Sequence, residues 1–130
     1  MPSDQAMPST EMRIIVADGN DNFRNVLVEL LRDDGHDVVS VAHGGELVAE
    51  AKKNPPDVIV SHVRFPDLNA LEALELLAAS GIRVPTILTS GDPRAVSKAE
   101  AHRLGAAAVL EKPFTMEQLR KAVADIASKK

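Results

Sequence analysis

Four polar residues come at or directly after the ends of apolar runs, where α/β proteins commonly carry out their chemistry. Asp18 follows "RIIVA", His62 ends "VIVSH", Ser90 ends "TILTS" and Lys112 follows "AAVLE". If these runs are parallel strands, their carboxyl ends bring a carboxylate, an imidazole, a hydroxyl and an ammonium to one crevice. An imidazole beside a carboxylate could sense pH near neutrality, whereas these two ligands alone are a weak basis for a transition-metal site.

The elements that must position these residues alternate regularly along the chain. Short β-branched runs predict buried strands, and leucines at helical spacing predict helices between them. Asp92 before Pro93 is typical of a helix start, and Thr115 with Gln118 predicts a capping box for the last helix. The predicted strands are 12–18, 36–42, 57–62, 84–90 and 107–111, and the predicted helices cover about 21–34, 45–53, 71–80, 92–104 and 115–126.

Strands joined by helices of this length form a parallel sheet with right-handed crossovers. We therefore predict an α/β fold, a flavodoxin-like (βα)5 doubly wound parallel sheet with strand order 2-1-3-4-5, over residues 12–128. Residues 1–11, rich in Pro, Ser and charge, are predicted to be a disordered N-terminal arm. In this strand order, Asp18 and His62 end neighbouring strands at the edge where a site forms.

Composition narrows the class of protein. The chain of 130 residues is long enough for one domain, and its 45% apolar content suits a globular protein. No apolar run is long enough to span a membrane, and no signal peptide is present, so we expect a cytoplasmic protein. A net charge of −4, three Phe and no Trp or Tyr argue against nucleic acid as a partner. The absence of Cys excludes disulfides and thiolate metal sites.

Three motifs at the predicted strand ends carry a family resemblance. "VRFPDLNALE" after the third strand, "TSGDP" after the fourth and "EKPF" after the fifth together resemble the receiver domain of two-component response regulators. The resemblance spans about residues 12–128 and implies phosphorelay signalling. Family receivers accept a phosphoryl group from a histidine kinase onto an aspartate, with Mg²⁺ held by that aspartate and two further acids.

Mapped position by position, the resemblance implies a degenerate phosphorylation pocket. Asp18 matches the first metal-binding acid, whereas Gly19 stands where the second is expected. His62 stands at the phosphoacceptor position, and Ser90 and Lys112 match the hydroxyl and lysine that contact the phosphoryl group. Because Mg²⁺ prefers oxygen ligands, we expect its binding to be weak or absent and predict no cofactor.

The predicted fifth strand departs from the family as well. Val109 occupies the position of the switch Tyr or Phe that family receivers reorient on phosphorylation. In the family this movement changes the face made by the fourth helix, the fifth strand and the fifth helix. With Val109 there, we expect one conformation rather than a switch, with the same face still able to bind partners.

Several residues allow more than one interpretation. Asp21 and Asp67 could act as surrogate acids, but a helix cap and a solvated loop residue are the favoured interpretations. His62 could sense pH or simply fill the pocket, and Lys112 could form a structural ion pair with Asp18. If His62 faces Asp18, its pKa is expected to rise above about 6.5.

These observations favour a pseudo-receiver that is not an enzyme and acts as a protein-interaction module. Its expected partners are a histidine kinase or a downstream effector, bound through the face of the fourth helix, fifth strand and fifth helix. The alternative is a phosphotransfer receiver with an unconventional acceptor. A flavodoxin-type small-molecule binder is less favoured because "DGNDNF" lacks the composition of a phosphate loop. The sequence leaves the oligomeric state open.

Overall fold

The sheet has five parallel strands in the order β3-β2-β4-β5-β6, which confirms the predicted topology. The computed structural model describes residues 11–92, 94 and 96–129, so nearly all of the predicted N-terminal arm lies outside the described residues. The strands are β2 (Arg13–Ala17), β3 (Asp37–Val41), β4 (Val58–His62), β5 (Thr86–Ser90) and β6 (Ala106–Glu111). The helices are α1 (Asp21–Asp33), α2 (Gly44–Lys53), α3 (Ala70–Ala79), α4 (Lys98–Arg103) and α5 (Met116–Ala127).

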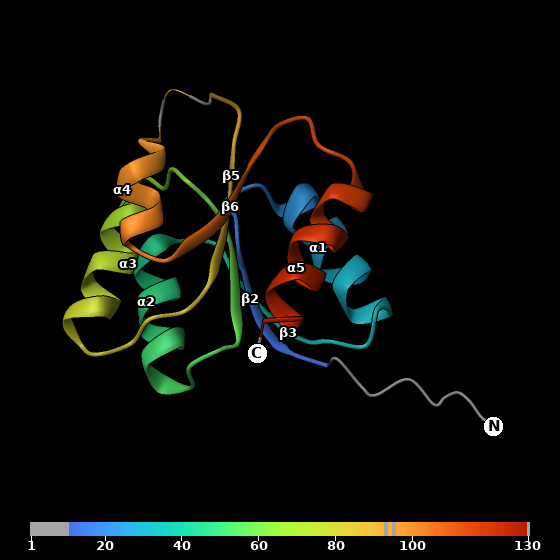
Figure 1. The fold of residues 1–130 in the computed structure, drawn as a ribbon, viewed down its shortest axis with the longest axis horizontal. Helices are drawn as coiled ribbons and strands as arrows, with labels where there is room; N and C mark the ends of the chain where they lie inside the picture. Colours follow the sequence, from blue (N-terminus) through green and yellow to red (C-terminus); the bar gives the residue numbers. More distant parts are fainter. Residues whose placement is uncertain (1–10, 93, 95, 130) are drawn as a thin grey trace.

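Two layers of helices cover the sheet, with α1 and α5 on one face and α2, α3 and α4 on the other (Figure 1). The strand sequences produce this arrangement because successive side chains point to opposite faces. In β2, Ile14 and Val16 join the core under α1 and α5, while Ile15 and Ala17 join the core under α2 and α3. Both faces are therefore buried, as continuous apolar strands require.

Strand register places the candidate residues level with one another. Ala17 pairs with Ser61, so Asp18 and His62 come next on their two strands, and His62 pairs with Thr89. Paired residues in a sheet share a face. Asp18, His62 and Thr89 thus form a row at the carboxyl edge of the sheet, on the side of α1 and α5.

Two helix starts differ from the sequence predictions. Asn20, not Asp21, caps α1: its side chain accepts a hydrogen bond from the N–H of Phe23 at 2.9 Å. The fourth helix begins at Lys98, with Ser97 as its cap, rather than at Asp92. The capping box of α5, formed by a Thr and a Gln, is present as predicted.

Candidate functional site

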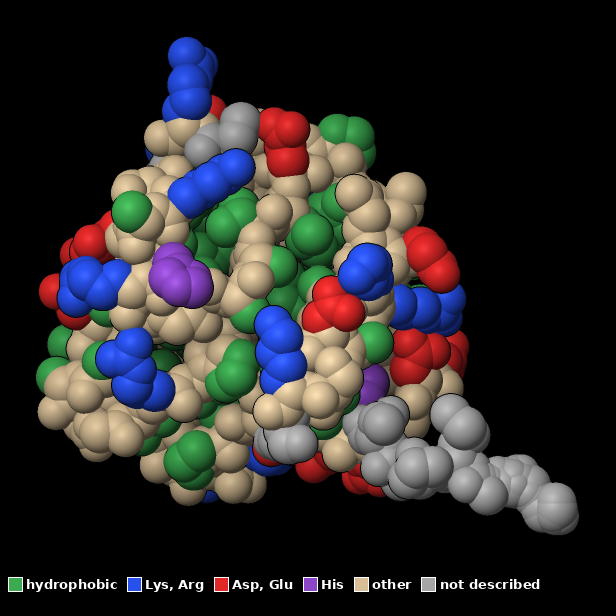
Figure 2. Space-filling model, in the orientation of Figure 1, with side chains coloured by type: hydrophobic (Ala, Val, Ile, Leu, Met, Phe, Trp, Pro, Cys, Tyr) green, Lys and Arg blue, Asp and Glu red, His purple; other side chains and the backbone are tan. Residues whose placement is uncertain are grey.

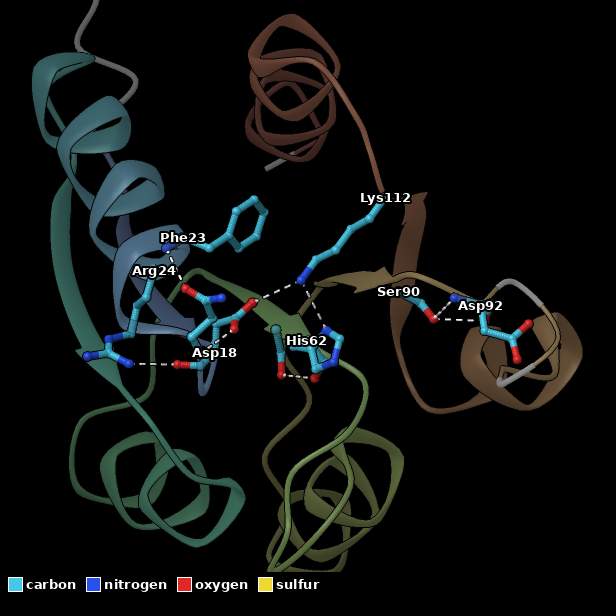
Figure 3. A network of polar contacts seen from close by, with 9 residues as sticks. Asp18, Phe23, Arg24, His62, Ser90, Asp92 and Lys112 are labelled. Carbon is cyan, nitrogen blue, oxygen red and sulfur yellow. Dashed lines mark hydrogen bonds and ion pairs between the residues drawn. The ribbon is translucent and has the colours of Figure 1, made fainter.

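Lys112 brings the two strand ends together at the centre of the crevice (Figure 3). Its Nζ lies 3.4 Å from Oδ2 of Asp18 and 3.4 Å from Nδ1 of His62. The predicted ion pair between Lys112 and Asp18 is therefore confirmed. Lys112 reaches the crevice from the loop after β6, where its bond to Pro113 is cis.

An aromatic side chain from α1 completes the surroundings of the ammonium. Lys112 Nζ lies 4.2 Å from the centroid of the Phe23 ring, a cation–π distance. Phe23 in turn packs edge-on against Phe114, with ring centroids 5.8 Å apart. Phe23 is not singled out by the sequence analysis, although its place within the first helical turn after Asp18 is a signal that could assign it to the crevice.

Asp18 is engaged on both carboxylate oxygens. Oδ2 faces Lys112, and Oδ1 accepts a hydrogen bond from the N–H of Asn20 at 2.8 Å. Its main-chain carbonyl accepts a further bond from Arg24 of α1 at 2.7 Å. With its side chain only 5% exposed, Asp18 is a buried carboxylate whose partners all come from this chain.

The pKa of His62 is lowered from its ordinary value, contrary to the sequence-based expectation. Burial is the largest cause, and the nearby charge of Lys112 is the next. Asp18 acts in the opposite direction but is outweighed by burial and by Lys112. A neutral ring is consistent with Nδ1 accepting from the Lys112 ammonium, which places the ring proton on Nε2.

The donor set does not fit Mg²⁺. Gly19 offers no side chain and His62 offers nitrogen, so of these three positions only Asp18 supplies a carboxylate, whereas Mg²⁺ requires several oxygen ligands. Within residues 11–92, 94 and 96–129, no group of three His, Cys, Asp or Glu side chains is arranged to hold a metal ion. Space is not the obstacle, since a Cβ at Gly19 would lie 3.7 Å from its nearest neighbour, the Ala42 carbonyl oxygen.

Ser90 and Val109, the other two predicted residues, lie on the β5–β6 side and are engaged locally. The Ser90 hydroxyl donates to the Asp92 carbonyl at 2.8 Å and accepts from the Asp92 N–H at 3.1 Å. Val109 is half-buried and packs against the small core under α4. The Ser90 carbonyl accepts a hydrogen bond from the N–H of Lys112 at 2.7 Å, but among the described residues neither the Ser90 nor the Val109 side chain contacts the side chain of His62 or Lys112. The structure therefore joins Asp18, His62 and Lys112 but ties Ser90 to its own loop.

Asp67 is exposed in its loop, as the favoured interpretation predicted, but its carboxylate binds the start of α2 rather than acting as a surrogate acid in the crevice. Its carboxylate accepts hydrogen bonds from the N–H groups of Gly44 and Gly45 at 3.1 Å and 2.9 Å, at the start of α2. These bonds lower the pKa of Asp67, as expected for a carboxylate at a helix N-terminus. They pin the loop after β4 to α2, a long-range contact that local sequence patterns did not indicate.

Thr89 is a buried residue of the crevice row that sequence analysis did not single out. It is 1% exposed, and its hydroxyl oxygen has no hydrogen-bond partner among the described residues. Its strand position made it appear an ordinary core residue. In the row it lies beside His62, on the same face of the sheet.

No helix among the described residues is long and apolar enough to cross a membrane. Residues 14–124 match the response regulator receiver domain family. PilH of Pseudomonas aeruginosa is 30% identical over 113 residues, which cover 85% of this chain and 93% of PilH. The transcriptional regulatory protein PdtaR of Mycobacterium tuberculosis is 28% identical over 123 residues, and the chain spans 60% of its length.

A solved receiver domain shows the same fold with a magnesium ion bound. The receiver domain of the sensor histidine kinase PA1611 of Pseudomonas aeruginosa is 25% identical, with a TM-score of 0.80. The aligned part covers 91% of this chain and 98% of that domain, whose structure holds a magnesium ion in its active-site cleft. The matched residues, the strand order and the strand-end constellation show that this chain belongs to the response regulator receiver domain family.

Proposed function

We propose that this receiver domain does not take up phosphoryl groups and instead acts as a protein-interaction module in two-component signalling. One observation carries the proposal: Lys112 lies 3.4 Å from both Asp18 and the acceptor-position His62. The groups that would bind a phosphoryl group and its metal ion bind one another instead. The crevice is then a structural element of the fold.

The chemistry of phosphoryl transfer supports this proposal. Such transfer depends on cations that neutralise the developing charge and on precise positioning of the reacting groups. Here the Asp18 carboxylate is already paired with the Lys112 ammonium, and Gly19 supplies no ligand. We propose accordingly that the domain has no self-catalysed phosphorylation and binds Mg²⁺ no better than about 10 mM.

The partner surface proposed is the face formed by α4, β6 and α5. Val109 packs there beside Leu88, Val96 and Ala101, with no ring available to reorient. Figure 2 shows hydrophobic side chains on this face between α4 and α5, with Lys, Arg and a histidine on the α4 side. We propose a histidine kinase or a downstream effector as the partner, and a conformation that needs no phosphorylation to bind it.

The test is exposure to acetyl phosphate with Mg²⁺, and separately to beryllofluoride with Mg²⁺, monitored by NMR and intact mass. We expect no added phosphoryl group and no shift of the amides around Asp18, His62 and Lys112. The positive control is the variant with Gly19→Asp and His62→Asp, described below. Labelling of the natural protein that disappears in His62→Gln would instead establish the unconventional acceptor.

A further inference from the structure

The outer edge of β6 is open. Within the described residues β6 pairs only with β5, so one side of its backbone has no strand neighbour. The N–H of Lys112 donates to the Ser90 carbonyl at 2.7 Å, which places the strand groups of Leu110 on the β5 side. Because backbone groups alternate along a strand, those of Val109 and Glu111 point outward. Such groups are a template for pairing with another strand.

Small side chains leave this edge accessible. A groove of about 340 Å³ runs between α4 and β6, with Ala106, Ala107, Ala108 and Val109 along its floor. Ala107 is exposed, and Ala108 and Val109 are half-buried. Natural edge strands usually carry charges or proline that discourage pairing, whereas β6 has a single charge, Glu111, at its end.

Two donor side chains line the helical wall of the groove. Lys98 and His102 stand four residues apart on α4, and neither has a recorded partner in the described part of the chain. Four helical residues advance about 6 Å along the axis. Two strand residues advance about 6.6 Å, so side chains at alternate positions of an extended segment match this spacing.

We propose that an extended acidic segment of a partner protein adds to the edge of β6, with carboxylates at alternate positions on Lys98 and His102. The outward backbone groups of Val109 and Glu111 supply hydrogen bonds, and the small apolar side chains between the acids point to the opposite face of the sheet, toward α5. This inference rests on the proposed function, since it specifies the chemistry of the partner at the α4–β6 part of the proposed face.

A second copy of this chain fits the edge less well. If two β6 strands paired, each would present Ala106–Glu111, in which only the last residue is acidic. No pair of carboxylates at alternate positions would then reach Lys98 and His102. A partner helix would fill the groove but leave the outward N–H and C=O groups of β6 unpaired. The extended acidic segment satisfies both features of the surface.

The experiment uses a synthetic peptide, acetylated and amidated, with the sequence TEVEVET, titrated into the labelled full chain and followed by NMR. We expect amide shifts confined to residues 98–111 and slowed hydrogen exchange of the Val109 amide. A peptide with Lys in place of Glu should not bind. The Lys98→Glu, His102→Glu variant should bind TEVEVET about tenfold more weakly, because two favourable contacts become repulsive.

Val109→Pro separates strand addition from charge alone. It removes an outward N–H, which edge strands tolerate, while Val109→Ala trims the same side chain and keeps that donor. We expect Val109→Pro to lose most peptide binding and Val109→Ala to retain it, with both folded by NMR. Equal binding by the two variants, or no binding of TEVEVET by the natural chain, overturns the inference. Neither result bears on the acetyl phosphate test, which decides the proposed function independently.

Discussion

Polar side chains are paired with one another in the crevice around Lys112, whereas those of the groove beside β6 have no partner among the described residues. In the crevice, Lys112, Asp18 and His62 are bound to one another and to neighbouring parts of the chain. In the groove, Lys98, His102 and the outer edge of β6 have no recorded partners within the described residues. A charged group already paired within the fold has little left to offer a ligand, whereas an unpaired one retains its binding capacity.

This difference distinguishes the carboxyl edge of the sheet, where family receivers are phosphorylated, from the proposed partner surface. Receivers share a sheet whose carboxyl edge can hold a metal and a phosphoryl group, and this chain keeps the sheet and the lysine. It has no acidic residue at position 19 or 62. Gly19 is exposed and His62 is half-buried, so these positions have little influence on the core. Under the proposed function, the absence of acids at these two positions leaves the fold and the proposed partner face in place.

The largest effect on this difference is expected from placing acidic residues at positions 19 and 62. We expect the variant with Gly19→Asp and His62→Asp to bind Mg²⁺ at least tenfold more tightly than the natural chain and to be labelled by acetyl phosphate. Three carboxylates would then repel one another without the cation, at a cost of about 1–3 kcal/mol in the free energy of unfolding. Mg²⁺ should recover part of that loss because it binds the folded state.

His62→Asp alone is the matched control, and it should recover much less because Gly19 still supplies no ligand. Calorimetry, intact mass and urea unfolding measure the three effects. A double variant that folds but takes neither metal nor phosphoryl group would contradict the idea that only the acids are missing. Relay to the α4–β6–α5 face should stay poor in either variant, since Val109 has no ring.

A smaller effect is expected when the centre of the crevice is removed. Lys112→Met leaves the buried Asp18 carboxylate with the Asn20 N–H but without its ammonium, and should lower the free energy of unfolding by about 1–3 kcal/mol. Lys121→Met, at an exposed ion pair on α5, is the control and should change stability little. Urea unfolding compares them; equal stabilities would mean that the crevice contributes nothing to the fold.

Much of this architecture was predictable from the sequence because it depends on local patterns. Strand order followed from five alternating βα units, and the Thr115 capping box followed from spacing alone. The pairing of Lys112 with Asp18 was also predictable, since a fold with parallel strands brings those strand ends together. Each of these follows from periodicity or from the topology that periodicity implies.

The incorrect predictions have a different cause: competing side-chain hydrogen bonds and tertiary contacts override the local pattern. Asp92 and Pro93 look like a helix start, but the Ser90 hydroxyl holds the Asp92 backbone in a loop. Asp67 caps α2 across 22–23 residues of chain. The pKa of His62 depends on its burial and on the balance of the charges of Lys112 and Asp18. Residue spacing alone does not predict that the Lys112 ammonium contacts the His62 ring.

The smallest effect we predict is the pH dependence that His62 confers. Its lowered pKa means that the unfolded chain, with a value near 6.5, binds the proton more readily than the folded chain. The stabilising contribution of the neutral ring is thus fully present above about pH 6.5 and is lost as pH falls from there through the folded pKa. Burial, Lys112 and Arg64 lower this pKa, whereas Asp18 and a hydrogen bond with the Thr89 backbone raise it.

Urea unfolding across this pH range should show the natural chain losing stability relative to His62→Gln as the pH falls, with a constant difference above the window. An NMR titration of the ring should give a pKa below 6.5 in the natural chain and a higher one in Lys112→Met, where the neighbouring positive charge is gone. A ring that titrates above 6.5 would show that Asp18 prevails over burial and Lys112. His62 would then be protonated at a higher pH than expected. Its Nδ1 would carry a proton and could not accept a hydrogen bond from Lys112, so the contact between these two side chains would have to break.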